Sequence, residues 1–229
     1  LMDRAQPFLP PAGWMQSAML ARVVSIDDPE ARDRVQLRLF AFDGVDDQDA
    51  PLWARVVCPF AGDERGAFFM PDVGDEVLVV FVQGDARYPL VLGGLWNGSS
   101  AAPADLGSEG NRFKRIRSKN GVVVTLDDRQ GQESLVLETP AGQRVTLGDG
   151  PSTITVEDAN GNRVVMNGSS IAFSAAAKLR IDAPQVEISA GMVKVDSALA
   201  EFSGIVKCQM VQTTAVVSTS YTPGAGNIW

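Results

Sequence analysis

The chain has 229 residues, with 20 Lys and Arg against 28 Asp and Glu, a net charge of −8, two cysteines and no histidine. The missing histidine excludes Ser-His-Asp triads and nearly all catalytic zinc sites. The two cysteines, Cys58 and Cys208, lie 150 positions apart and predict no metal cluster. The acidic balance argues against nucleic-acid binding. Composition therefore predicts no catalytic residue, cofactor, metal ligand or nucleic-acid partner.

No apolar run reaches the roughly 18 residues of a membrane-spanning helix. The start, Leu1-Met2-Asp3-Arg4, predicts no signal peptide, and the leucine ahead of the methionine suggests a fragment of a longer chain. Residues 1–105 carry 8 basic and 16 acidic side chains, whereas residues 106–229 carry 12 of each. This shift indicates two domains.

The first part predicts a small β-barrel. Its strand-like runs are rich in Val, Leu, Phe or Trp and are separated by Gly, Pro and Asp. Val35, Leu37 and Leu39 alternate with polar or larger neighbours, which is the period of a half-buried strand. Five strands in about 80 residues favour a closed barrel such as an OB-fold. The runs are Met19–Ile26, Val35–Phe42, Leu52–Val57, Glu76–Val82 and Leu90–Trp96.

The second part repeats with a period near 20. Three similar units contain Gly121, Gly142 and Gly161, which are spaced 21 and 19 apart. Further strand-like runs, Ser134–Glu138 and Thr153–Glu157, lie between the units. Such a period is typical of a repeated β unit.

From Lys178 the repeat shortens to seven residues, with apolar pairs two positions apart. Two positions turn a helix by about 200°, to opposite faces, but return a strand to the same face. Pro184 and Gly191 would also damage a helix. These residues therefore predict β structure. The pairs are Leu179/Ile181, Val186/Ile188, Val193/Val195 and Ala200/Phe202.

A single ribbon of this kind has open edges and no second layer, and isolated ribbons are marginally stable. Three entwined chains pair every edge and enclose one dry axial core. We therefore predict an obligate homotrimer, built as a triangular β-helix or β-prism. Its predicted core residues are Leu179, Ile181, Val186, Ile188, Val193, Val195, Phe202, Val206 and Cys208.

The segments from Trp53 to Gly62, Gly66 to Phe81 and Gly84 to Gly93, followed by Trp96-Asn97, resemble the OB domain of the VgrG and phage-baseplate central spike family. That family occurs in contractile phage tails, type VI secretion systems and extracellular injection systems. The resemblance implies an all-β chain in which an N-terminal OB barrel is followed by an intertwined trimeric needle. The expected domains are a linker at 1–17, the barrel at 18–98, a linker at 99–112, the needle at 113–215 and a cap at 216–229.

The resemblance also implies a mechanical role as the spike that pierces a target cell envelope when a sheath contracts. A hub or baseplate protein is expected on the N-terminal side, and a PAAR-like tip protein at the C-terminus. The target membrane would be touched only transiently. Assembly would occur in the bacterial cytoplasm and action outside the cell. Residues expected to plug the needle end or dock the tip are Tyr221, Asn227, Ile228 and Trp229.

Two other functions compete with this prediction. A trimeric β-helical tailspike that binds or degrades surface polysaccharide would need paired carboxylates in a groove. The acidic residues of the second part instead alternate with basic ones, as on a solvated face. An adhesive or nucleic-acid-binding OB protein would need a basic, aromatic groove, and residues 1–105 have a net charge of −8.

Overall fold

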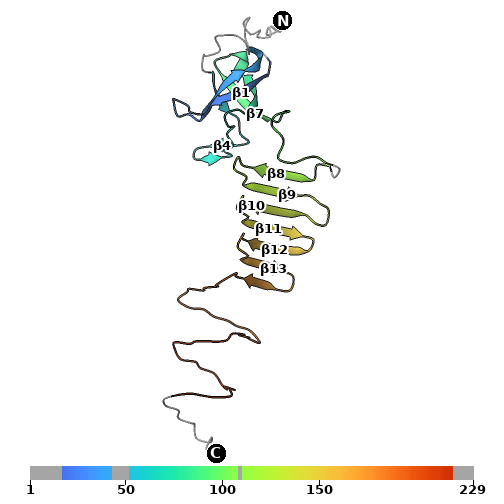
Figure 1. Cartoon of the computed structure of the whole chain (residues 1–229). Coiled ribbons are helices and arrows are strands. Elements are labelled where there is room, and N and C mark those ends of the chain that lie inside the picture. Colours follow the sequence, from blue (N-terminus) through green and yellow to red (C-terminus); the bar gives the residue numbers. More distant parts are fainter. Residues whose placement is uncertain (1–16, 43–51, 108–109, 219–229) are drawn as a thin grey trace, which may run out of the picture. The chain divides into compact units, whose positions relative to one another are not determined.

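The computed structural model describes residues 17–42, 52–107 and 110–218 (Figure 1). The chain divides between Lys178 and Leu179 into two units, which are described separately. The first unit holds a barrel and a seven-stranded sheet, and the second is the segment from Leu179 onward. In the described part of the chain, no helix is long and apolar enough to cross a membrane.

Five strands close the predicted barrel in the order β1-β2-β3-β7-β6. Neighbours pair antiparallel except β3 and β7, which pair in parallel. This is the five-stranded Greek-key barrel of the OB-fold, as the sequence predicts. The strands are β1 (Met19–Ser25), β2 (Arg34–Leu39), β3 (Leu52–Val56), β6 (Glu76–Phe81) and β7 (Pro89–Leu95).

Alternation along the strands builds the barrel core. Val77 and Val79 on β6 are fully buried, and Phe81 is nearly so, while the residues between them point outward. Val35 and Leu37 on β2 follow the same period, which confirms the expected inward face. The remaining core residues are Ala21, Val23, Leu39, Ala54 and Val91.

Three details of the barrel differ from the prediction. The run expected as one strand to Phe42 ends at Leu39, and Phe40–Phe42 forms a 3-10 turn, η1. A second 3-10 turn, η2 (Val82–Gly84), follows β6. A small hairpin of β4 (Ala61–Gly62) and β5 (Arg65–Gly66) was not predicted, because two-residue strands carry no periodic signal.

The second part begins as a seven-stranded antiparallel sheet in which each strand pairs with the next along the chain (Figure 1). The predicted runs Ser134–Glu138 and Thr153–Glu157 are confirmed as strands, the second beginning one residue earlier. The strands are β8 (Phe113–Arg117), β9 (Val123–Asp127), β10 (Ser134–Glu138), β11 (Arg144–Asp149), β12 (Ser152–Glu157), β13 (Arg163–Asn167) and β14 (Ile171–Ser174).

The period near 20 is the period of one recurring turn. Gly121, Gly142 and Gly161 have φ between 85° and 89°, a conformation that glycine adopts without strain. In each turn the N–H of the glycine donates to the carbonyl three residues earlier. The Ser118, Thr139 or Asp158 side chain at that earlier position also accepts an N–H bond from the residue after the glycine. The repeated glycines therefore mark hairpins along one sheet edge.

Residues 179–218 form no strand in the single chain, and Figure 1 draws this segment as a zigzag of extended pieces. A strand needs a hydrogen-bonded neighbour, and within residues 179–218 the chain supplies none. The predicted β pairing of this segment therefore depends on other copies of the chain and stays a prediction.

Candidate functional site

One face of the seven-stranded sheet is almost entirely apolar. Its side chains form two rows that cross the strands in register. Row A crosses all seven strands, and row B crosses six, with Lys114 at its β8 end. We call the two rows together the apolar face. Row A is Ile116, Val124, Leu137, Val145, Val156, Val164 and Phe173, and row B is Leu126, Leu135, Leu147, Ile154, Met166 and Ile171.

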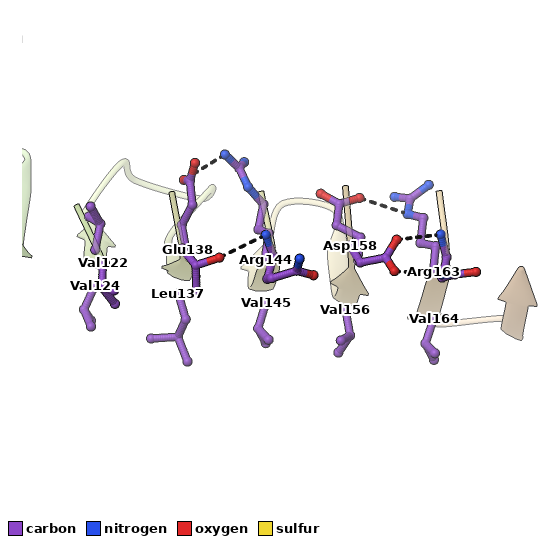
Figure 2. A pocket seen from close by; sticks show the side chains of 15 residues that line it. Val122, Val124, Leu137, Glu138, Arg144, Val145, Val156, Asp158, Arg163 and Val164 are labelled. Atoms are coloured by element: carbon purple, nitrogen blue, oxygen red, sulfur yellow. Dashed lines mark hydrogen bonds and ion pairs between the residues drawn. The ribbon is translucent and has the colours of Figure 1, made fainter. Parts of the chain in front are cut away.

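No described element of the chain covers this face. Figure 2 shows Val124, Leu137, Val145, Val156 and Val164 projecting from the same side of the sheet, where they line a shallow apolar groove. Eight of the 13 side chains are 40–65% exposed. A contiguous apolar surface of this kind is typical of an interface between proteins.

The opposite face of the sheet mixes charged pairs with threonine and valine side chains, such as Thr146, Thr155 and Val165. A carboxylate oxygen of Glu138 lies 2.9 Å from a guanidinium nitrogen of Arg144 across β10 and β11 (Figure 2). Glu157 and Arg163 pair in the same way at 3.5 Å across β12 and β13. Arg144 also stands opposite Glu157 in the β11–β12 register. Exposed pairs of this kind add little stability. The middle of this face is more covered than its charged border, since Thr155 is only 9% exposed. The sheet therefore has one uninterrupted apolar face and one face on which charged, polar and apolar side chains are mixed.

Ion pairs and capped turns fix the ends of the sheet. Arg112 binds both carboxylate oxygens of Asp127 and so lowers the pKa of that carboxyl. The guanidinium carbons of Arg112 and Arg115 lie 4.7 and 5.6 Å from the centre of the Phe113 ring. At the turn before β13, hydrogen bonds from Asn162 lower the pKa of Asp158. These groups stabilise the geometry of the sheet, and each carboxylate already has partners within it.

The residues predicted as the trimer core lie in the second unit and are all exposed in the single chain. The eight larger ones are 56–71% exposed, and Cys208 is exposed as well. The structure of one chain therefore gives them no apolar partner. The predicted tip residues Tyr221, Asn227, Ile228 and Trp229 lie outside the described residues.

Sequence reasoning missed the apolar face as part of the core. The signal was present, because each repeat glycine is followed at positions +3 and +5 by an apolar pair, such as Val145 and Leu147 after Gly142. Pairs two residues apart also lie on β10, β12 and β14. The same pairing continues past Lys178 as Leu179 and Ile181. The apolar face and the predicted core are thus one pattern, whose spacing shortens from about 10 residues to seven.

Two domain families match the chain. Residues 19–96, which span the barrel strands, match the type VI secretion system/phage-baseplate injector OB domain. Residues 134–199 match the phage baseplate V C-terminal trimerisation domain. The second match includes five strands of the apolar face and the first three apolar pairs beyond Lys178.

The chain is also similar to curated spike proteins of type VI secretion systems. The chain is 34% identical over 113 residues to the type VI secretion system spike protein VgrG4b of Pseudomonas aeruginosa, which is 47% of this chain and 14% of that protein. It is 34% identical over 97 residues to VgrG5 of the same organism, covering 40% and 12%. It is 29% identical over 102 residues to VgrG3 of Vibrio cholerae, covering 44% and 9%.

The matched segments thus span about a seventh or less of these relatives. The barrel match, the trimerisation-domain match and the spike relatives all agree with the motifs between Trp53 and Asn97. The chain belongs to the family of VgrG and phage-baseplate spike proteins.

Proposed function

We propose that this chain is the central spike of a contractile injection system and works as a homotrimer whose needle pierces the target cell envelope. The observation that carries this proposal is the apolar face, 13 side chains in two registered rows that the single chain leaves uncovered. The trimerisation-domain match over residues 134–199 supports three copies as the covering partner.

Burial of that face supplies the energy for assembly. A fully buried Val, Leu or Ile side chain gains about 1.5–3 kcal/mol, and these side chains are already about half covered, so each would gain about 1 kcal/mol. Three such faces turned inward form a triangular prism with a dry axis. The charged faces with Glu138 and Arg144 then lie outside. Sheets joined in this way form a stiff rod, which suits a part that transmits force.

The shortening repeat extends the same needle towards the C-terminus. Along row A, neighbouring positions lie 8–13 residues apart in the sequence, as between Val145 and Val156. The β13–β14 hairpin already has the spacing of the later repeat, since Val164/Met166 and Ile171/Phe173 lie seven residues apart, but residues 179–218 form no such hairpin in the single chain. The strands of this segment would instead pair with strands of the other two chains, so that three chains wind around one axis.

The proposed spike has a different protein partner at each end of the chain. The barrel seats on a hub or baseplate protein on the N-terminal side. The C-terminal residues Tyr221, Asn227, Ile228 and Trp229 dock a PAAR-like tip protein. The spike is assembled in the bacterial cytoplasm, leaves the cell as part of the particle, and touches the target membrane transiently. The role is mechanical rather than catalytic, in keeping with relatives that are themselves spike proteins.

Native mass spectrometry of the full chain and of a variant without the last ten residues tests this function. We expect three times the chain mass of 24.4 kDa for both. Binding of a PAAR-like protein should be retained by the full chain and lost by the truncated one. A stable monomer with intact β structure would contradict the spike. Hydrolysis of surface polysaccharide by the purified trimer would favour the tailspike function instead.

A further inference from the structure

The outer surface of the barrel carries an apolar patch that the barrel fold does not use. It spans β1, β6 and β7, where outward positions are normally polar. Leu20 stands opposite Leu78, and Val80 stands opposite Leu90. Leu20 and Leu92 are 43% and 46% exposed, and the other three are half-buried. We call this surface the leucine patch: Leu20, Leu78, Val80, Leu90 and Leu92.

The rest of the barrel exterior differs. The outward positions of β2 carry Arg34, Gln36 and Arg38, and those of β3 carry Trp53 and Arg55. The leucine patch is therefore confined to one side of the barrel.

A second apolar surface lies on the β4–β5 hairpin. Phe60, Phe68 and Phe69 are 62%, 75% and 69% exposed, and we call them the phenylalanine hairpin. The N–H of Ala67 donates to the carbonyl of Phe60 at 3.2 Å, so the hairpin holds its two aromatic ends together. Gly66 makes this closure possible, because it has φ +155° and a Cβ there would stand 2.9 Å from the Phe60 oxygen.

Three arguments identify a second copy of this chain as the partner of these surfaces. The five described barrel strands close on themselves and leave no free edge among them, so these strands can contact a partner only through side chains. The chain from Leu95 at the end of β7 to Phe113 at the start of β8 spans at most about 60 Å, so a trimeric needle keeps three barrels at high effective concentration. A three-fold ring also needs two different complementary surfaces on each subunit.

We propose that the leucine patch of one barrel packs against the phenylalanine hairpin of the next, so that three barrels close a ring. This inference rests on the proposed trimer and adds the surfaces by which the barrels join it. The ring would give the needle a rigid three-fold base in place of three barrels that do not contact one another.

Disulfide cross-linking of the full chain tests the ring. In a Cys58→Ser/Cys208→Ser background, Leu20→Cys is combined with Phe69→Cys, and Leu92→Cys with Phe68→Cys as a second pair. Serine at position 58 keeps the donor that now bonds the Phe60 carbonyl. After mild oxidation, we expect at least one pair to give a covalent trimer on a non-reducing gel.

Each single-cysteine variant should remain uncross-linked. The matched control combines Phe69→Cys with Arg32→Cys, because Arg32 is an exposed residue of the β1–β2 loop outside both surfaces. This double variant should also give no covalent trimer. Cross-linking by Leu20→Cys alone would overturn the pairing of unlike surfaces, as would a disulfide formed only within one chain.

Native mass of the same samples separates the two proposals. A trimeric mass without a covalent trimer in either pair would overturn the ring and leave the spike intact. A monomeric mass for the cysteine-free background would overturn the spike, and the ring with it.

Discussion

Asp28 binds Arg34 through both carboxylate oxygens, with Oδ1 2.7 Å from a terminal guanidinium nitrogen and Oδ2 2.9 Å from Nε. The same carboxylate accepts N–H bonds from Glu30 and Arg32 in the loop between β1 and β2. That loop holds two non-glycine residues, Ala31 and Asp33, at φ 48° and 53°. Asp28 therefore offsets the strain of a loop that the local sequence would not adopt alone.

The first prediction concerns Asp28→Asn and pH. Hydrogen bonds from Arg34 hold the pKa of Asp28 far below its usual range. A lowered native pKa stabilises the fold above the unfolded value, about 3.9, and this contribution is lost as pH falls through the native value. The variant should melt at a lower temperature at pH 7, and its melting temperature should fall less than that of the parent between pH 5 and pH 2.

Circular dichroism melts across that pH range measure the effect, and Asp63→Asn at the tip of the β4–β5 hairpin is the control. The melting temperature of Asp63→Asn should follow that of the parent protein across this pH range. An unchanged acid profile in Asp28→Asn would show that the ion pair does not stabilise the loop.

A second prediction compares two glycines of the sheet. Gly142 has φ +85°, and a Cβ there would stand 3.3 Å from the Cβ of Ala159 in the next turn. Gly168 has an ordinary φ and open space around it. Gly142→Ala should cost about 1–2 kcal/mol, whereas Gly168→Ala should be neutral or stabilise by up to about 1 kcal/mol. Urea titration measures both, and equal effects would contradict the turn geometry.

Much of the fold follows from the sequence because period-2 alternation and glycine turns are local signals. Val77, Val79 and Phe81 are assigned to the barrel interior without knowledge of any contact. The short β4–β5 hairpin has too few residues for a period, and Phe40–Phe42 continues an apolar run although the backbone leaves the strand there. These features depend on tertiary packing.

Of the apolar residues proposed to form the trimer core, the sequence predicted only those beyond Lys178 and missed the apolar face of the sheet. The pairs after Lys178 recur every seven residues without interruption, so their pattern is plain. In the sheet, turns of different length separate the pairs, as between Leu137 and Val145 and between Val145 and Val156. The common face becomes visible only when the register aligns the strands.

The third prediction tests the apolar face with two adjacent residues of β11. Leu147 lies on the apolar face and is 41% exposed in the single chain, whereas Thr146 lies on the opposite face and is half-buried. In a monomer, Leu147→Asp would therefore be the milder change. In the trimer it places three unpaired carboxylates at a dry axis, at a cost of several kcal/mol each. We expect Leu147→Asp to abolish the trimer by native mass and Thr146→Asp to retain it, and the reverse order would contradict an inward apolar face.

The last prediction applies the same logic to the segment beyond Lys178. Ile188 is 71% exposed in the single chain and its neighbour Glu187 is exposed as well, so neither substitution would matter to an isolated chain. If three chains bury Ile188, Ile188→Asn loses about 2–3 kcal/mol per chain in apolar burial. Glu187→Gln removes only a solvated charge. Limited proteolysis should therefore cut the Ile188→Asn segment much faster than the parent, with Glu187→Gln unchanged. Equal cleavage of all three proteins would show that this segment does not pack in the assembly, because only burial against other copies distinguishes the two positions.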